Sequence, residues 1–186
     1  MLHEQYRPTK WEDVIGQEAA IASLARIKAR TGFGGRAYLI TGGSGQGKTT
    51  IARIMASEVA DKADIHEIDA RDCTIDAVRE MVACFRLAER CTLFSMSKVW
   101  IINETDDLRA DVLARFKTAL EPIPAGCAVI FTCTKESAKL LWEDSEDAPA
   151  QHGTCHTVSG MTHDTSATCI QTCARNAAPV SAVIRQ

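Results

Sequence analysis

Short apolar runs alternate with helical periodicities along the first 142 residues. Apolar positions recur at helical spacing between residues 17 and 29, and similar patterns predict helices over residues 49–59, 74–88, 107–120 and 137–142. Runs typical of strands buried on both faces cover residues 37–41, 99–102 and 128–132, and a shorter strand is expected over residues 65–68. Strands that alternate with helices indicate a parallel sheet between helical layers. We therefore predict one α/β domain.

The sequence changes in character after about Glu143. Large apolar residues become rare, and Ser, Thr, His, Cys and Ala dominate. The spacing over residues 164–176 fits a helix, but its apolar face is thin. This part of the chain does not predict a compact second domain, and the abrupt change also fits a fragment or a truncated reading frame.

Charge and hydropathy exclude a protein that is basic overall and a protein that spans a membrane. The net charge is −3, with 46% hydrophobic and 24% charged residues. Any contact with nucleic acid must therefore come from a local basic surface. No apolar run approaches the roughly 20 residues of a membrane span, and the first residues lack a signal-peptide pattern. We expect a cytoplasmic protein without membrane contact.

Eight cysteines are many for 186 residues, but none forms a C-x-x-C pair. A disulfide framework is not expected without a secretory signal. Cys169 and Cys173 are spaced for one helix face, and His152, His156 and His163 precede them, which leaves a zinc site open. Small buried thiols are the interpretation we favour over zinc.

Residues 42–49 match the phosphate-loop pattern G-x-x-x-x-G-K-[ST] at every position. Glycines let backbone amides turn toward phosphates, Lys48 reaches the β- and γ-phosphate oxygens, and the Thr49 hydroxyl binds Mg²⁺. An apolar strand precedes the loop and a helix follows it, which disfavours a merely flexible glycine turn. The predicted nucleotide contacts come from this loop and the residue after it: Gly43, Ser44, Gly45, Gln46, Gly47, Lys48, Thr49 and Thr50.

A second requirement is an acidic group at the end of a neighbouring strand. Asn103 and Glu104 follow the apolar run 99–102, where the usual pattern is Asp-Glu. Asn103 can orient a metal-bound water but adds no negative charge, so we expect weak Mg²⁺ binding by Thr49 and Asn103. Glu104 is placed to polarise the attacking water; alternatively, it only caps the following helix.

With these motifs in place, the chain resembles the AAA+ ATPase domain of clamp-loader subunits of the DNA polymerase III gamma/tau or replication factor C small-subunit kind. The likeness covers roughly residues 4–157 and is carried by segments 4–18, 42–49, 68–80 and 113–124. It implies a P-loop NTPase domain of three layers with a parallel sheet over residues 1–157. Residues 158–186 would be a partial, truncated α-helical lid or a poorly ordered tail, and the full lid would extend past residue 186.

The resemblance also assigns residues to the nucleotide. Tyr6, Arg7, Pro8, Val14 and Ile15 match the family's opening segment, which holds the adenine and ribose of ATP. The alternative is an N-terminal strap packed on the core. Thr134 takes the place of the family's sensor asparagine and is our third candidate catalytic residue, with Lys48 and Glu104. Thr154 stands where the family carries its arginine finger, so this chain is not expected to supply one.

Partners follow from the same resemblance: other clamp-loader subunits, a sliding clamp and primed double-stranded DNA. Arg71, Thr74, Arg79 and Arg109 are the candidates for phosphate contacts with DNA, although solvated surface charge explains them equally well. One apolar set corresponds to the region that docks on the clamp, or else forms a core-facing stripe: Met81, Cys84, Phe85, Leu93 and Phe94.

The resulting functional hypothesis is an ATP-binding subunit that couples Mg·ATP binding and hydrolysis to the loading of a sliding clamp on primed DNA. Hydrolysis would need an arginine finger from a partner. A degenerate nucleotide switch or structural subunit that does not hydrolyse ATP is the alternative that Asn103, Thr134 and Thr154 favour. Another AAA+ motor on DNA, such as a branch-migration ATPase, shares the opening segment and the phosphate loop.

Overall fold

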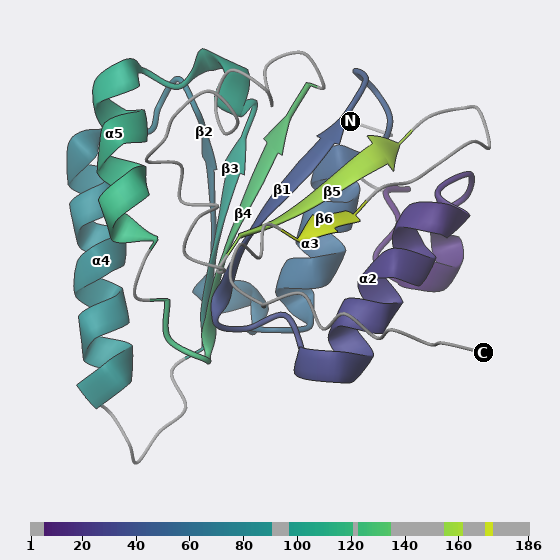
Figure 1. Ribbon diagram of the computed structural model, residues 1–186, viewed down its shortest axis with the longest axis horizontal. Coiled ribbons are helices and arrows are strands. Elements are labelled where there is room, and N and C mark those ends of the chain that lie inside the picture. Colours follow the sequence, from purple (N-terminus) through teal and green to yellow (C-terminus); the bar gives the residue numbers. More distant parts are fainter. Residues whose placement is uncertain (1–5, 91–96, 121–122, 135–154, 162–169, 173–186) are drawn as a thin grey trace, which may run out of the picture.

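A sheet between two helical layers forms the body of the protein (Figure 1). The computed structural model describes residues 6–90, 97–120, 123–134, 155–161 and 170–172, the last two ranges by their backbone only. The helices are η1 (Trp11–Asp13), α2 (Glu18–Thr31), α3 (Lys48–Ser57), η2 (Lys62–Asp64), α4 (Ile75–Arg90), η3 (Thr105–Asp107) and α5 (Ala110–Ala119). The strands are β1 (Arg36–Gly42), β2 (Ile65–Asp69), β3 (Lys98–Asn103), β4 (Cys127–Cys133), β5 (Cys155–Met161) and β6 (Ile170–Thr172).

The strand order is β2-β3-β4-β1-β5-β6, and the first five strands are parallel. Strand β6 runs antiparallel to β5 at the edge. In the centre Leu39 of β1 is paired with Phe131 of β4. The carboxyl ends of parallel strands meet at one edge of a sheet, which is where ligands of such folds bind.

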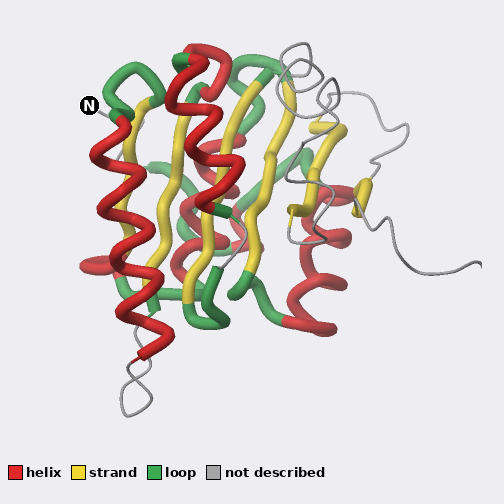
Figure 2. The backbone as a smooth tube through the Cα atoms, turned by 60° about the vertical axis from the view of Figure 1, so that its left-hand side comes forward, coloured by secondary structure: helices red, strands yellow, loops and turns green. Residues whose placement is uncertain are grey.

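Strand β1 is buried on both faces because its side chains alternate between the two helical layers. Ala37 and Leu39 join the core formed with α4 and α5. Tyr38 and Ile40 join the core formed with α2 and α3. Figure 2 shows the two layers on opposite sides of the sheet. A nearly continuous apolar run is therefore what this strand requires.

The structure confirms the four predicted strands of the first 134 residues and the four helices predicted between residues 17 and 120. The helix α4 begins where expected, since the amide of Ala77 donates to the Thr74 hydroxyl at 3.2 Å. The helix expected over residues 137–142 lies outside the described residues.

The C-terminal region was predicted less well. Residues 170–172 are a strand, so the helix over residues 164–176 is wrong there, and β5 crosses the boundary we placed at residue 157. Strand β5 pairs along the free side of β1, whose backbone groups would otherwise form an open edge. That long-range pairing leaves little trace in the local sequence pattern.

The structure shows for two residues of the apolar stripe of α4 whether they face the core or the surface. Met81 and Phe85 are each 1% exposed and pack in the core with Trp100. These two residues therefore do not offer a clamp-docking surface, because the helix must bury them against the sheet. Cys84 is half-buried, and Leu93 and Phe94 lie outside the described residues. The exposed large apolar side chain of α4 is Leu87.

Candidate nucleotide-binding site

The loop between β1 and α3 lies at the carboxyl edge of the sheet, and α3 begins at Lys48. Gly45 and Gly47 have φ angles of 73° and 79°, a left-handed conformation that glycine adopts without strain. A Cβ atom added to either glycine would meet no atom within 4 Å. Glycine is therefore required at these positions by the backbone conformation and not by crowding, and the space beside both residues is open.

Lys48 lies folded over this loop. Its ammonium group donates to the carbonyl oxygens of Gly43 at 2.8 Å and Gly42 at 3.1 Å. The amide of Gly43 in turn donates to the side-chain oxygen of Gln46 at 2.7 Å. A phosphate oxygen is a stronger acceptor for both donors, since it carries charge. The loop thus fits a phosphate group, as the sequence pattern predicts.

The first turn of α3 is joined to the end of β3 by two side chains. The Thr49 hydroxyl donates to Asn103 Oδ1 at 3.2 Å, and Asn103 is only 6% exposed. Thr132 at the end of β4 donates to the same oxygen at 3.2 Å. The Thr49 hydroxyl and the Asn103 carboxamide oxygen are a pair of oxygen ligands of the kind that Mg²⁺ accepts. The sequence-predicted metal residues are thus brought together.

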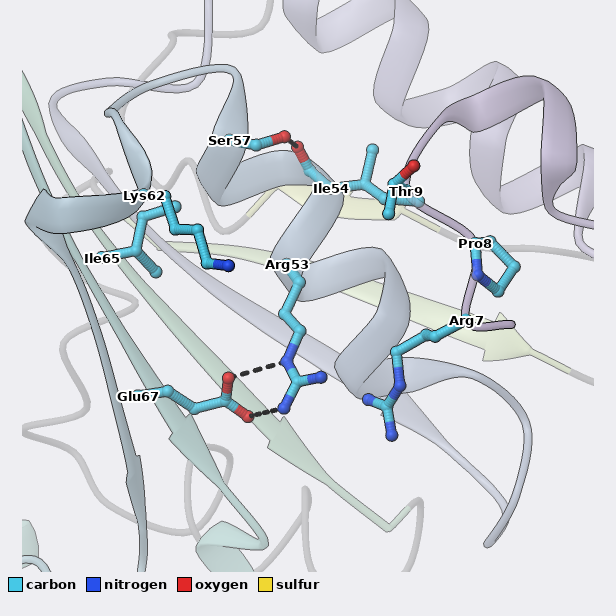
Figure 3. Close-up of a pocket in the computed structure, with 9 residues that line it drawn as sticks. All are labelled: Arg7, Pro8, Thr9, Arg53, Ile54, Ser57, Lys62, Ile65 and Glu67. Atoms are coloured by element: carbon cyan, nitrogen blue, oxygen red, sulfur yellow. Dashed lines mark hydrogen bonds and ion pairs between the residues drawn. The ribbon is translucent and has the colours of Figure 1, made fainter. Parts of the chain in front are cut away.

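At its other end Asn103 contacts Glu67, which is bound in turn by Arg53, and the sequence analysis missed both residues. Its Nδ2 donates to Glu67 Oε1 of β2 at 2.7 Å. Arg53 of α3 binds the same carboxylate through two hydrogen bonds of 2.7 and 3.0 Å, as Figure 3 shows. No local pattern marks either residue, because β2, β3 and α3 meet only in the folded chain.

Glu104 follows β3 in a left-handed conformation, with φ 53° and ψ 48°. This conformation costs a non-glycine residue about 1–3 kcal/mol, and such strain is often found at functional sites. Its backbone amide donates to the Thr132 hydroxyl at 3.3 Å. Its side chain makes no capping hydrogen bond to η3, so the capping alternative is wrong for the side chain, although its carbonyl accepts from Asp107.

Thr134, predicted as the sensor position, is held by η3. Its amide and its hydroxyl both bind the carboxylate of Asp106, at 3.0 and 3.3 Å. The polar end of β4 is therefore tied to the segment that follows Glu104. Thr154, at the expected position of the arginine finger, lies outside the described residues.

The N-terminal segment contributes only part of the predicted base site. Arg7 and Pro8 line a pocket of about 570 Å³ between this segment, α3 and β2, which is drawn in Figure 3. Tyr6, Val14 and Ile15 are not in its lining, and Tyr6 and Ile15 are 78% and 90% exposed. Trp11 packs against the core, and its indole nitrogen donates to Glu58 at 2.5 Å. The N-terminal segment therefore also packs on the core, as the alternative of an N-terminal strap predicts.

Each arginine proposed for DNA pairs with an acid. Arg71 contacts Asp107 at 2.7 Å, and the hydrogen bond and charge of Asp107 raise the pKa of Arg71. Arg79 and Arg109 pair with acids on or beside their own helices, Asp76 and Asp111. Arg79 also lines a groove of about 450 Å³ between α4 and α5 with Arg86 and Arg115, which the sequence analysis did not single out.

Three cysteine thiols are buried: Cys73, Cys127 and Cys133. Burial raises the pKa of each, and for Cys133 burial together with the charge of Asp106 raises it to about 12. The described side chains contain no cluster of three His, Cys, Asp or Glu residues fit for a metal ion. The side chains of the proposed zinc ligands lie outside that description. No described helix has the length and apolarity needed to cross a membrane.

Comparison with known proteins places these features in context. Residues 38–142, more than half of the chain, match the ATPase family associated with various cellular activities (AAA). The chain is 30% identical to the replication factor C small subunit of Methanoregula boonei over 139 residues, which are 72% of this chain and 42% of that protein. It is 27% identical to the DNA polymerase III subunit tau of Bacillus subtilis over 157 residues, 72% of this chain and 27% of that protein.

Among solved structures, a variant of RuvB from Thermotoga maritima has the same fold, with a TM-score of 0.56 and 22% identity. It covers 83% of this chain, which covers 49% of that structure. The chain thus spans less than half the length of each of these relatives.

Proposed function

Because the chain belongs to the AAA family of ATPases, we propose that it is the ATP-binding subunit of a clamp-loader-like complex. In this proposal Mg·ATP binding and hydrolysis are coupled to the loading of a sliding clamp on primed DNA. The names of the relatives support this role over other motors on DNA, since they include replication factor C subunits and DNA polymerase III subunits.

The observation that carries the proposal is the contact between Thr49 and Asn103 beside the phosphate loop. It places an alcohol and a carboxamide oxygen, from α3 and β3, at the same carboxyl edge of the sheet as the phosphate loop and Lys48. This is the arrangement by which phosphate-loop proteins hold nucleotide and metal together.

Each residue then has a defined task. The amides of residues 43–47 and the Lys48 ammonium group bind the β- and γ-phosphates. Thr49 and Asn103 would hold Mg²⁺, which neutralises charge on these phosphates. The Glu104 carboxylate, exposed at the end of β3, orients and polarises the attacking water, and Thr134 lies at the end of the adjacent strand. We assign adenine and ribose to the N-terminal segment with Tyr6, Arg7, Pro8, Val14 and Ile15.

Partners complete this proposal. An arginine finger from a neighbouring subunit raises turnover about 10³–10⁵-fold in such enzymes, so the isolated chain should turn over slowly. We assign DNA phosphate contacts to Arg71, Thr74, Arg79 and Arg109. Phosphates would have to compete with the acids that pair with the three arginines. Binding should weaken as salt rises, because DNA releases counterions when its phosphates are neutralised.

A nucleotide switch that does not hydrolyse ATP is the second candidate function. Asn103 favours it, because a neutral amide at the metal site lowers the attraction for Mg²⁺. The same fold and the same nucleotide contacts would then serve assembly alone.

An ATPase assay separates the two functions. Turnover is measured with and without primed DNA and with a partner subunit that carries an arginine finger. Stimulated turnover that disappears in Glu104→Gln supports the clamp-loader ATPase. Nucleotide binding without turnover under every condition supports the switch, and absence of any nucleotide binding contradicts both.

A further inference from the structure

Asn103 is held at both ends of its carboxamide. Its oxygen accepts from the hydroxyls of Thr49 and Thr132, both at 3.2 Å. Its nitrogen donates to Glu67 Oε1 at 2.7 Å. The Thr132 hydroxyl also accepts from the amide of Glu104, so its own proton is directed to Asn103. The amide group therefore has one favoured orientation.

Glu67 decides that orientation. A carboxamide has a donor end and an acceptor end of nearly the same shape, and rotation by 180° exchanges them. An ionised carboxylate only accepts hydrogen bonds, so the Glu67 side must receive the NH₂ group. Arg53 keeps Glu67 in place with two further hydrogen bonds. The oxygen of Asn103 is thereby left facing Thr49.

We propose that Glu67 is a positioning residue for the metal site: it takes the Asn103 NH₂ group and keeps the carboxamide oxygen turned toward Thr49 and Mg²⁺. This inference rests on the proposed Mg·nucleotide site. With Glu67 present, Asn103 offers a metal or its bound water the same kind of acceptor that an aspartate would offer. Without Glu67, the Thr132 hydroxyl alone directs a proton to the Asn103 oxygen, and the amide can turn more readily and present its NH₂ group, which repels a cation.

The same geometry predicts that aspartate at position 103 is not interchangeable with asparagine here. An Asn103→Asp change would place a carboxylate oxygen at the position of Nδ2, 2.7 Å from Glu67 Oε1. Two carboxylates at this distance repel each other. A simultaneous Glu67→Gln change removes that repulsion and supplies an NH₂ donor. The negative charge at position 103 should therefore favour Mg²⁺ only in the double variant.

The experiment measures nucleotide affinity with a fluorescent ATP analogue, in EDTA and across a Mg²⁺ titration. In Glu67→Met, we expect the Mg²⁺ concentration for half-maximal effect to rise about 10- to 100-fold, the effect typical of losing a group that orients a metal ligand. Affinity in EDTA should stay within about twofold of wild type. Glu67→Gln keeps an acceptor for the NH₂ group and should stay within about threefold.

Two controls address folding and general charge loss. Asp64→Asn neutralises another ion-paired carboxylate, which contacts Lys98 at 2.9 Å, and should not alter the Mg²⁺ dependence. Independently of nucleotide, the Asn103 side-chain NH₂ signals in an NMR spectrum should exchange slowly with water in wild type and fast in Glu67→Met. If Glu67→Met does not fold, the comparison of Asn103→Asp with the double variant serves instead, and the double variant should bind Mg²⁺ more tightly.

A folded Glu67→Met with wild-type Mg²⁺ dependence and protected Asn103 signals would overturn the inference. Equal Mg²⁺ affinity in Asn103→Asp and the double variant would also overturn it. If wild type bound no nucleotide with or without Mg²⁺, the proposed function itself would fail, a result distinct from either of these.

Discussion

The ammonium group of Lys48 lies 2.8 Å from the carbonyl oxygen of Gly43, within its own phosphate loop. The loop and its lysine are thus already assembled around the place where phosphates would bind. Binding requires Lys48 to exchange carbonyl acceptors for phosphate oxygens, which form stronger, charge-assisted hydrogen bonds.

Removal of this ammonium group should weaken ATP binding. Charge-assisted hydrogen bonds contribute about 1.5–3 kcal/mol each, so Lys48→Ala is expected to lower affinity about 10- to 150-fold. Titration of a fluorescent ATP analogue measures the change. Lys28→Ala is the matched control, because this lysine forms an exposed ion pair with Glu58 away from the loop. Unchanged affinity in Lys48→Ala would argue against a phosphate site at this loop.

Glu104→Gln should separate binding from turnover. The change keeps the size of a side chain that makes no capping hydrogen bond to η3, but it removes the carboxylate that polarises water. We expect unchanged ATP affinity and a loss of stimulated turnover of about 10²–10⁴-fold, the range for a general base. Single-turnover measurements with a finger-bearing partner provide the readout. Wild-type turnover in this variant would remove Glu104 from the mechanism.

The pair of Arg71 and Asp107 gives a test of DNA binding with opposite signs. Arg71→Ala should weaken binding to primed DNA and reduce the salt slope by about one phosphate contact. Asp107→Ala leaves the charge of Arg71 without its 2.7 Å partner and should strengthen binding. Arg26→Ala is the control, because Arg26 is exposed on α2, which packs on the opposite face of the sheet. Equal effects of Arg71→Ala and Arg26→Ala in fluorescence anisotropy would show that Arg71 is solvated surface charge.

The buried side of α4 can be tested through stability. Phe85 is 1% exposed and packs edge-to-face against Trp100, so Phe85→Ala should cost about 3–5 kcal/mol of unfolding free energy. Because Leu87 is 53% exposed, Leu87→Ala should lower the unfolding free energy by less than about 1 kcal/mol. Urea unfolding followed by circular dichroism compares them. A small effect of Phe85→Ala would reopen the clamp-docking assignment of that stripe.

The buried thiols predict a loss of stability at alkaline pH. In the folded protein the pKa of Cys133 is about 12, whereas the ordinary value is 9.0. Between these values the unfolded chain releases the proton and the folded chain keeps it. Unfolding free energy should therefore fall as pH rises from about 9 to 12, by up to about 1.4 kcal/mol per pH unit for this thiol.

Cys133→Ala should make this alkaline decline shallower, since it removes one of the groups that titrate. Val112→Ala, a change at a buried residue without a titratable group, should instead lower stability by a similar amount at every pH. Identical pH slopes in wild type and Cys133→Ala would contradict a raised pKa at this position.

The sequence by itself determined the layered α/β fold and the phosphate loop. Burial on both faces forces a continuous apolar run, as in β1, and the glycines with positive φ at positions 45 and 47 are visible as residue types. Both signals lie in short stretches of sequence, so they can be recognised without the structure. Whether Phe85 lies at the surface or in the core depends on how α4 packs against the sheet, so the sequence alone left both possibilities open.

Only the tertiary structure decided how the site is held. Thr49, Asn103 and Glu67 lie on α3, β3 and β2, and their hydrogen bonds exist because these elements meet at one sheet edge. Likewise, β5 and β6 extend the sheet through pairing with distant strands. Glu67 lies 36 residues before Asn103 in the chain. No spacing rule links the two residues, because the role of Glu67 depends on this contact and not on the residues beside it.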